Sequence, residues 1–389
     1  MQSLFLWGMI MNDYLQHYQM KITALSPIHI GNGNLIGKKE YIQKSLRQPV
    51  IIPDLGKMFH DLQLLRKDAA FERYMLGNEK MGLGQWMQQE NIPEEKIESW
   101  KRYSLYSGDA FIRPESGKAA TPKGILAFIK DAYGMPYVPG SSIKGMIRTA
   151  LLALEVREHP QKFDRIKKNL EEVAFSYGQE RKNSKNYLKK ETDELEIEAF
   201  HILEKDQSNI KNAVNSCLSG IIVSDSKPIA LKNLTLSQKI DYSFSGKEMP
   251  LPILREALIP GTEIIFELTI DTSVCKYTIK DILEALDCFQ EISYQYFYSR
   301  FRRGNNVSGT VWLGGGTGFL SKTVLYPIFE DRAVRITDAV FKNTIGKNYN
   351  IHKHNQDISK RLAPHMCKCT RYRNQLYDMG MGRIEVISG

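Results

Sequence analysis

The alternation of apolar and polar residues predicts a β-strand near the start of the chain. Between residues 21 and 30 apolar side chains occupy alternate positions, with Ser26 in the one polar place: Ile22, Ala24, Ile28 and Ile30. A period of two puts these side chains on one face of a strand. The sequence Gly-Asn-Gly-Asn at residues 31–34 then predicts a tight loop directly after it.

A second extended region, residues 125–138, leads to a helix that begins at the Pro139-Gly140 pair. Beyond this pair the apolar residues recur at helical spacing: Ile143, Ile147, Ala150, Leu151 and Leu154. The first half of the chain therefore contains a strand, a long insertion, a second strand and a helix.

The second half repeats this plan. Residues 221–223 and 262–270 are predicted strands, and Thr278 begins the clearest helix of the chain, with Asp281 as a capping-box partner. Its apolar positions are Ile279, Ile282, Leu283, Leu286, Phe289, Ile292 and Tyr296. Extended segments are predicted at residues 311–313 and 323–329, on either side of a glycine-rich loop. We interpret residues 21–215 and 216–389 as an N-terminal and a C-terminal domain.

Two segments interrupt this plan. Residues 55–105 form a predicted helical insertion, with a break at residues 82–84 and these buried positions: Leu62, Leu65, Phe71 and Met75. Residues 157–190 are dense in basic side chains and are either a mobile loop or a solvated helix. Their cations are Arg157, Lys162, Arg165, Lys167, Lys168, Arg181, Lys182, Lys185, Lys189 and Lys190.

The composition favours a globular protein with a polyanionic partner. The 389 residues are 42% hydrophobic and 25% charged, with a net charge of +9, which suits nucleic acid better than an acidic membrane. The apolar run at residues 4–11 is too short to span a bilayer and lacks signal-peptide features. We interpret residues 1–20 as a leader that is not necessarily native. Five cysteines without framework spacing suit a reducing cytosol, so we expect a cytoplasmic protein.

The start of the helix after Pro139 has the features of an anion site. Ser141 or Ser142 can cap its free amides, and Lys144 and Arg148 follow on one flank. Cations near a helix N-terminus are disfavoured by the helix dipole, and a phosphate would relieve them. The alternative is a capped helix whose Lys144 and Arg148 extend into solvent.

The glycine-rich loop resembles a phosphate-binding loop in residues 316–323, but Ser321 replaces the second glycine. Because a strand-like run with Pro327 follows instead of a long helix, we exclude a nucleoside triphosphatase. Gly314, Gly315 and Gly316, with Gly318, instead predict close approach to another chain, either polynucleotide or protein. Lys322 adds one phosphate contact.

Four other groups of residues are candidates. His29 precedes the Gly-Asn-Gly turn and is either a general acid or base of RNA cleavage, or a structural or base-stacking histidine. Arg302 and Arg303 close the helix after Thr278, where the dipole favours cations in any case. The C-terminal residues His352, His354, His365, Cys367 and Cys369 include zinc-ligand types, but their spacing argues against zinc, and we expect no metal. The basic and aromatic residues around Cys369, including Arg371, suit phosphate and base contacts.

Together, several motifs resemble the RAMP superfamily of CRISPR proteins. They are residues 26–33 (Ser-Pro-Ile-His-Ile-Gly-Asn-Gly), residues 137–148 and residues 312–324. With residues 368–372 and 377–385, the late motif looks most like the family of fifth subunits of type III-A (Csm) effector complexes. This resemblance implies an α+β fold of tandem ferredoxin-like, RRM-related domains with helical insertions. It also implies a subunit without catalytic activity or cofactor that caps the 3′ end of the crRNA, supporting crRNA maturation and complex assembly in antiviral defence.

The resemblance assigns RNA contact to the residues singled out above: His29, Gly31, Asn32, Gly33, Ser141, Ser142, Lys144, Arg148, Arg302, Arg303, Gly314, Gly315, Gly316, Lys322 and Arg371. The implied partners are crRNA, the other Csm subunits (above all the repeated backbone RAMP subunit), target RNA and host trimming nucleases. One alternative function is a metal-independent endoribonuclease of the same superfamily that processes precursor crRNA with His29. Another is a scaffold that recruits a trimming nuclease through residues 157–190.

Overall fold

The fold is taken from a computed structural model of the chain, which describes residues 14–45, 48–78, 81–107, 109–110, 124–176, 187–304 and 306–389. The predicted leader lies outside these ranges up to residue 13, and so do Arg181, Lys182 and Lys185 of the basic segment. Within the described ranges, no helix has the length and apolar character needed to cross a membrane.

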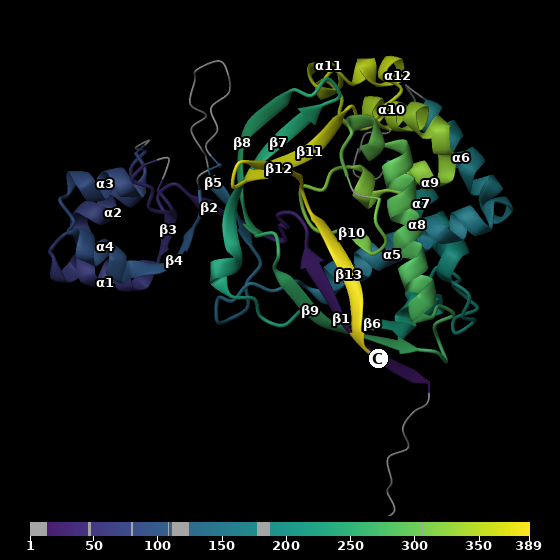
Figure 1. Cartoon of the computed structure of the whole chain (residues 1–389), viewed down its shortest axis with the longest axis horizontal. Coiled ribbons are helices and arrows are strands. Elements are labelled where there is room, and N and C mark those ends of the chain that lie inside the picture. Colours follow the sequence, from purple (N-terminus) through teal and green to yellow (C-terminus); the bar gives the residue numbers. More distant parts are fainter. Residues whose placement is uncertain are drawn as a thin grey trace, which may run out of the picture.

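A five-stranded antiparallel sheet, sheet A, has the strand order β10-β13-β1-β9-β6 (Figure 1). Its strands are β1 (Leu15–Ala24), β6 (Ile221–Val223), β9 (Glu263–Asp271), β10 (Thr310–Trp312) and β13 (Met381–Ser388). Along the chain, the strands of this sheet and the two helices between them follow in the order β1, α5, β6, β9, α8, β10 and β13.

Strand β1 confirms the predicted alternation but not its bounds. Met20, Ile22 and Ala24 are buried, as expected for one face of a strand. The strand starts earlier than predicted because the backbone pairs with β9 from Leu15, without an apolar pattern to mark it. It also ends earlier, before Pro27, a residue that cannot donate a ladder hydrogen bond. Residues 15–20 of the predicted leader therefore lie in sheet A.

Helices α5 (Gly140–Glu158) and α8 (Ile279–Tyr296) pack against each other and over sheet A (Figure 1). Helix α8 confirms the prediction in detail, since Thr278 accepts from the Asp281 N–H and Asp281 accepts from the Thr278 N–H. The predicted apolar face of α5 is also confirmed, with each of its positions buried: Ile143, Ile147, Ala150, Leu151 and Leu154.

A six-stranded sheet, sheet B, has the order β12-β11-β7-β8-β5-β2. Its strands are β2 (Gly31–Gly37), β5 (Gly124–Phe128), β7 (Leu234–Ser243), β8 (Glu248–Leu258), β11 (Met366–Tyr372) and β12 (Gln375–Asp378). Strands β5 and β8 are parallel, and the other neighbours are antiparallel. The glycine loop predicted after residue 30 is instead the irregular start of edge strand β2. Both sheets combine strands from before and after residue 215, so this predicted boundary does not separate them.

The predicted helical insertion is confirmed for residues 55–100, which have their own core (Figure 1), whereas residues 101–105 form a strand. The insertion contains β3 (Val50–Pro53), β4 (Lys101–Leu105), α1 (Leu55–Leu64), α2 (Asp68–Leu76), α3 (Leu83–Gln89) and α4 (Glu94–Trp100). Leu62 and Phe71 are buried as predicted, but Leu65 and Met75 are exposed. Instead Trp86 and Trp100 fill this core, because these short helices place their aromatic residues inward.

The remaining helices gather beside α5 and α8 (Figure 1). They are α6 (Asp164–Phe175), α7 (Lys189–Phe200), α9 (Leu325–Phe329), α10 (Ala333–Thr344), α11 (Asn348–Ile351) and α12 (Asp357–Lys360). The described part of the basic segment is thus largely helical, with Ile166, Leu170 and Ala174 buried. The extended segment predicted at residues 323–329 is wrong, since α9 occupies residues 325–329 and all of its residues are buried.

Candidate nucleic-acid interface

A groove of about 430 Å³ lies where three distant segments of the chain meet. These segments are the start of β2, the first turns of α5 and the glycine-rich loop after β10. We call it the glycine-loop groove, and its lining residues are Ile30, Gly31, Ser142, Gly145, Met146, Thr149, Trp312, Leu313, Gly314, Gly315, Thr317, Ser321 and Lys322. The tertiary structure thus joins one part of each of the three predicted RNA-binding motifs.

His29 connects two walls of this groove. Its main-chain oxygen accepts a hydrogen bond of 2.7 Å from the Gly315 N–H, and its Nδ1 lies 2.7 Å from the main-chain oxygen of Glu256. Burial lowers the pKa of His29 to about 4, assisted by the charges of Arg255, Lys130 and Lys322. The imidazole is therefore neutral at pH 7, with Nδ1 as the donor to Glu256.

Glu256 is the buried anchor below His29. Its carboxylate, fully excluded from solvent, accepts from the Tyr103 hydroxyl at 2.5 Å and from the Phe128 N–H at 2.8 Å. It also pairs with Lys130 at 2.5 Å. Glu256 on β8 therefore joins three segments. Its carboxylate contacts β4 and β5, and its main-chain oxygen contacts His29.

The glycine-rich loop has a backbone that requires glycine. Gly314 and Gly316 have φ values of +89° and +92°, which side chains rarely adopt. A Cβ on Gly314 would lie 2.3 Å from the His29 oxygen, and one on Gly316 would lie 2.8 Å from Met379 Sδ. These glycines thus closely approach the chain's own His29 segment and Met379, and their predicted approach to a polynucleotide or a second protein stays a prediction.

The N-terminus of α5 is occupied by the protein's own carboxylate. Pro139 is the N-cap, neither predicted serine caps the helix, and the Gly140 N–H donates to Asp225 Oδ1 at 2.8 Å. The prediction of free amides capped by Ser141 or Ser142 is therefore wrong. Ser142 lines the glycine-loop groove, whereas Ser141 is exposed outside it.

Lys144 and Arg148 do not stand free beside this terminus. Lys144 Nζ donates to the main-chain oxygen of Ile221 at 2.7 Å, and burial lowers the pKa of Lys144. Arg148 forms a partly exposed ion pair of 3.1 Å with Glu196 on α7. The helix dipole is thus accommodated by contacts within the protein, which sequence spacing does not reveal.

The other predicted cations divide into paired and unpaired groups. Arg303 pairs with Asp378 at 2.6 Å, and Arg371 holds the Glu248 carboxylate at 2.6 and 3.1 Å, so both serve the fold. Lys322 and Arg302 are exposed and form no ion pair within the described residues. Lys322 is the one of these two that lines the glycine-loop groove.

Asn32 and Gly33 remain outside the groove, on the exposed start of β2. Asn32 Oδ1 accepts from the Asn34 N–H at 2.9 Å and shapes this turn. Gly33 has a φ of +86° and open space where a Cβ would lie. These two residues therefore form an edge next to Gly31 and do not line the groove.

Sequence reasoning missed Gly145, Thr149 and Trp312 as groove residues. Gly145 is the most informative, because a Cβ there would meet nothing within 4 Å, although glycine weakens a helix interior. A glycine on an exposed helix face was the signal that could have found it. Trp312 is fixed by stacking on Tyr298 at 4.3 Å and by its indole N–H, which donates to Gln290 Oε1 at 2.6 Å.

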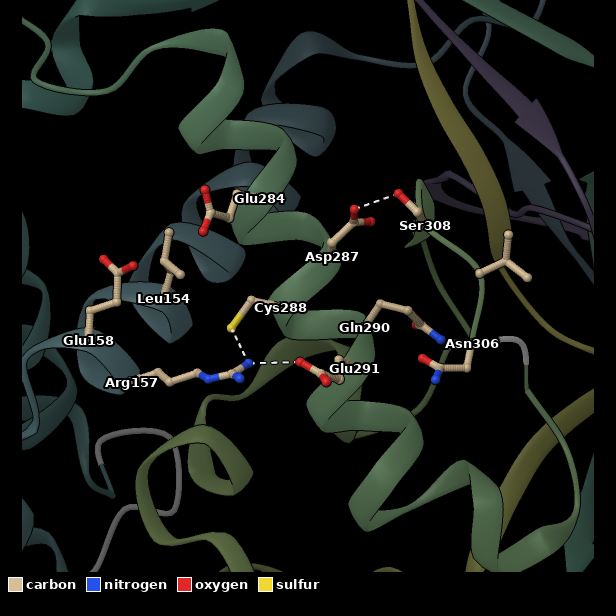
Figure 2. Close-up of a pocket in the computed structure, with 11 residues that line it drawn as sticks. Leu154, Arg157, Glu158, Glu284, Asp287, Cys288, Gln290, Glu291, Asn306 and Ser308 are labelled. Carbon is tan, nitrogen blue, oxygen red and sulfur yellow. Dashed lines mark hydrogen bonds and ion pairs between the residues drawn. The ribbon is translucent and has the colours of Figure 1, made fainter.

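A second pocket, of about 450 Å³, lies between α5 and α8 and has the opposite charge (Figure 2). Four acidic side chains line it, with one cation: Glu158, Glu284, Asp287, Glu291 and Arg157. Arg157 is itself paired with Glu291 at 2.9 Å. This pocket would repel a polyanion, so the glycine-loop groove is the better candidate for nucleic acid.

Two groups of metal-ligand types occur among the described residues. One is His354, Asp357 and His365, and the other is Cys367, Cys369 and Asp378. All five cysteines are free and buried. From the sequence spacing we expected no metal. The structure brings both groups of side chains together around the start of β11.

The chain belongs to the RAMP superfamily, whose family model matches residues 21–321. Among characterised relatives it is similar to the CRISPR system Cms protein Csm5 of Mycobacterium tuberculosis (strain CDC 1551 / Oshkosh), with 27% identity over 97% of this chain and 99% of the relative. The Csm5 protein of Streptococcus thermophilus is 29% identical over 80% of this chain and 81% of the relative. The predicted resemblance is therefore confirmed.

Two solved structures share the fold. The crystal structure of T. onnurineus Csm5 aligns with a TM-score of 0.59 and 18% identity, covering 93% of this chain and 99% of that one. One chain of a cryo-EM structure of a Csm–crRNA–target RNA ternary complex of a type III-A CRISPR-Cas system aligns with a TM-score of 0.58 and 18% identity. That alignment covers 95% of this chain and 100% of the other.

Proposed function

We propose that this protein is the Csm5-type subunit of a type III-A CRISPR effector complex and binds crRNA in the glycine-loop groove. The observation that carries the proposal is the meeting of Gly31, Ser142 and Lys322 around one groove, although they lie far apart in the sequence. The relatives named Csm5 align along most of both chains, which supports the same role for this one.

The groove suits a phosphodiester backbone better than a base-specific contact. Hydroxyl side chains and glycines dominate its lining, and Lys322 supplies an exposed cation. Thr149, Thr317 and Ser321 already donate within the protein, so we assign the phosphate contacts to Ser142 and Lys322. Such contacts do not depend on base sequence, and the cation adds a salt-dependent contribution by counterion release. Binding that tolerates any guide sequence is what a crRNA subunit requires.

Within the complex, we place this subunit at the 3′ end of the crRNA, next to the repeated backbone RAMP subunit. Target RNA and host trimming nucleases remain partners in this proposal, and a complex of this kind would act in the cytoplasm. The exposed edge strand β2 next to the groove supports a protein neighbour on that side, because an unpaired strand edge is a ready docking surface.

We also propose how the two sheets correspond to the domains of a RAMP protein. Four neighbouring strands of sheet A have the order β13-β1-β9-β6, and α5 and α8 lie between them along the chain. This is the βαββαβ arrangement of a ferredoxin-like domain, with β10 added at the edge next to β13. We propose that this unit and sheet B are the two RAMP domains. Sheet B includes a parallel β5/β8 pair and β7/β8 and β11/β12 hairpins, so it would be the more modified of the two.

We propose a non-enzymatic role. His29, the candidate general acid or base, is 4% exposed, and its pKa of about 4 leaves it without a proton to donate near pH 7. Its Nδ1 is already committed to Glu256. These features favour a structural histidine over the catalytic alternative.

The test is to assemble the type III-A complex with and without this chain and to measure bound crRNA. We expect the chain to copurify with crRNA, and a Lys322→Ala variant to retain fewer and shorter guides than a Lys280→Ala control. Lys280 is exposed on α8 and does not line the groove. Metal-free cleavage of precursor crRNA that disappears in His29→Ala would instead favour the endoribonuclease.

A further inference from the structure

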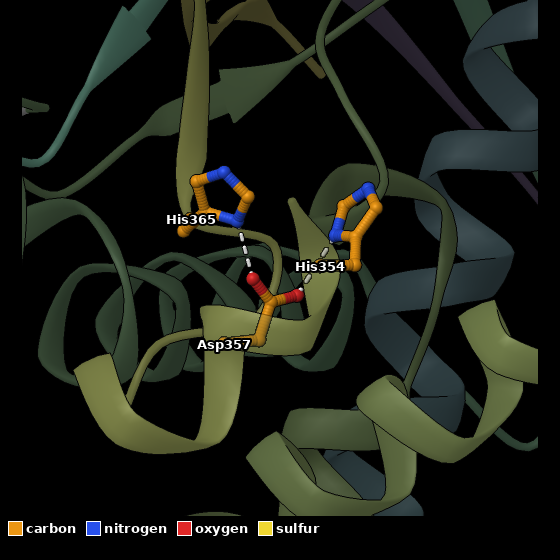
Figure 3. A group of neighbouring side chains, drawn as sticks. All are labelled: His354, Asp357 and His365. Atoms are coloured by element: carbon orange, nitrogen blue, oxygen red, sulfur yellow. Dashed lines mark hydrogen bonds and ion pairs between the residues drawn. The ribbon is translucent and has the colours of Figure 1, made fainter. Parts of the chain in front are cut away.

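A buried group of metal-ligating side chains lies where the C-terminal helices meet strand β11, away from the lining of the glycine-loop groove (Figure 3). His354 and Asp357 come from consecutive helical turns, the 3-10 helix at His354–Gln356 and α12, and their spacing of three places them on one face. His365 comes from the residue before β11. One ligand atom from each of the three lies within 4.8 Å of the others.

The charge of Asp357 makes this arrangement unusual. Its side chain is fully buried, and its oxygens contact His354 Nδ1 at 2.9 Å and His365 Nδ1. Within the described residues, Asp357 forms no ion pair with a lysine or an arginine. Two neutral imidazoles would leave a buried carboxylate uncompensated, which is costly.

His365 presents only one ring nitrogen, Nδ1, to this group, where it contacts the Asp357 carboxylate. This histidine is 1% exposed, and its Nε2 has no hydrogen-bond partner among the described residues.

We propose that His354, Asp357 and His365 bind one Zn²⁺ ion. Two imidazoles and one carboxylate form a zinc ligand set that leaves a fourth position for water. The ion neutralises the Asp357 carboxylate, and the protons that the imidazoles share with this carboxylate are released to solvent on binding. The His354 side chain is 12% exposed, which provides the side from which the ion enters.

The site is positioned to stabilise the loop side of the glycine-loop groove. The ring of His354 lies 4.6 Å from that of Phe341 on α10, which lies 4.9 Å from Phe319 of the glycine-rich loop. A bound ion would therefore hold the C-terminal helices against β11 and, through these rings, against the loop. Its role is structural and does not depend on the proposed function.

The neighbouring group of Cys367, Cys369 and Asp378 is the weaker candidate. Asp378 already accepts from Arg303 at 2.6 Å and from the Gly304 N–H at 2.9 Å. The positive charge of Arg303 compensates this carboxylate and would repel a metal ion.

The experiment uses the full chain, purified without a histidine tag, stripped with a chelator and titrated with Zn²⁺. We expect one zinc per chain by elemental analysis and a rise of about 3 °C in Tm with excess zinc. His354→Gln should lower zinc affinity at least 10-fold, in line with loss of a ligand. His352→Gln, which changes an exposed histidine stacked on His354, should bind zinc like the wild type.

Three outcomes would overturn the proposal. The wild-type chain could take up no stoichiometric zinc and show no change in Tm. His354→Gln could bind zinc as tightly as His352→Gln. Alternatively, zinc could be lost in a Cys367→Ser variant but kept in His354→Gln, which would assign the ion to the cysteine group. The wild-type titration decides the proposal even if a variant fails to fold.

Discussion

The main-chain oxygen of His29 accepts a hydrogen bond of 2.7 Å from the N–H of Gly315, near the other end of the chain. The same oxygen lies 2.3 Å from where a Cβ on Gly314 would be. This contact joins the early histidine motif to the late glycine motif and forms one side of the glycine-loop groove. Two motifs that are separate in the sequence are therefore one structural unit.

The first prediction concerns Gly314. Replacing Gly314 with alanine should lower the free energy of unfolding by about 3 kcal/mol, because the residue has a φ of +89° and no space for a Cβ. Urea denaturation provides the measurement. Gly145→Ala is the matched control and should raise stability by about 0.5–1 kcal/mol, since its Cβ meets open space in a helix. Equal destabilisation of both variants would contradict the prediction.

The second prediction concerns occupancy of the groove by RNA. Gly145→Gln should keep the fold but lower crRNA affinity about 10-fold, because its side chain extends into space that the RNA backbone would use. Fluorescence anisotropy with a guide-length RNA measures the affinity. Ser141→Gln, at an exposed position of the same helix outside the groove, should bind like the wild type. An unchanged affinity in Gly145→Gln would show that the RNA does not occupy the groove beside Gly145.

The third prediction uses the salt dependence of binding. Lys322→Ala should reduce the slope of log K against log salt by about 0.7, which corresponds to one phosphate contact on single-stranded RNA. Lys280→Ala should leave this slope unchanged. A slope that is the same in both variants would show that Lys322 does not contact phosphate, even if the overall affinity falls.

The fourth prediction concerns pH. The folded protein holds His29 at a pKa of about 4, below its ordinary value of 6.5, so the unfolded chain binds the proton more tightly. The resulting contribution of roughly 3 kcal/mol is complete above pH 6.5 and is lost as the pH falls through 4. Urea denaturation at pH 7 and pH 5 should therefore show a smaller pH effect in His29→Gln than in the wild type. His17→Gln, in an exposed position of β1, should retain the full effect.

The fifth prediction concerns the buried Glu256 carboxylate. Glu256→Gln leaves Lys130 without its ion-pair partner and replaces one acceptor of Tyr103 or Phe128 with a donor. We expect a loss of about 3 kcal/mol in stability. The double variant Glu256→Gln with Lys130→Met should recover part of this loss, because it removes the unpaired cation. A double variant less stable than Glu256→Gln alone would argue against the ion pair as the cause.

The amino-acid sequence by itself determined the local structure wherever one pattern was strong. The alternation around Ile22 and the Thr278 capping box both act within a few residues, so their strand and helix could be predicted. The family motifs were also readable, because they depend on residue order alone. The predicted strand bounds were wrong where the backbone pairs without an apolar pattern to mark it, as at residues 15–20 of β1.

Only the tertiary structure decided which charged and polar groups were already in use. Lys144, Arg303 and Arg371 look alike in the sequence as free cations, yet each has a partner from a distant segment. The same is true of the Gly140 amide after Pro139, which donates to Asp225. These partners lie far along the chain, and no local spacing encodes them. The sequence therefore named the motifs of the groove, and long-range packing selected Gly31, Ser142 and Lys322 to line it.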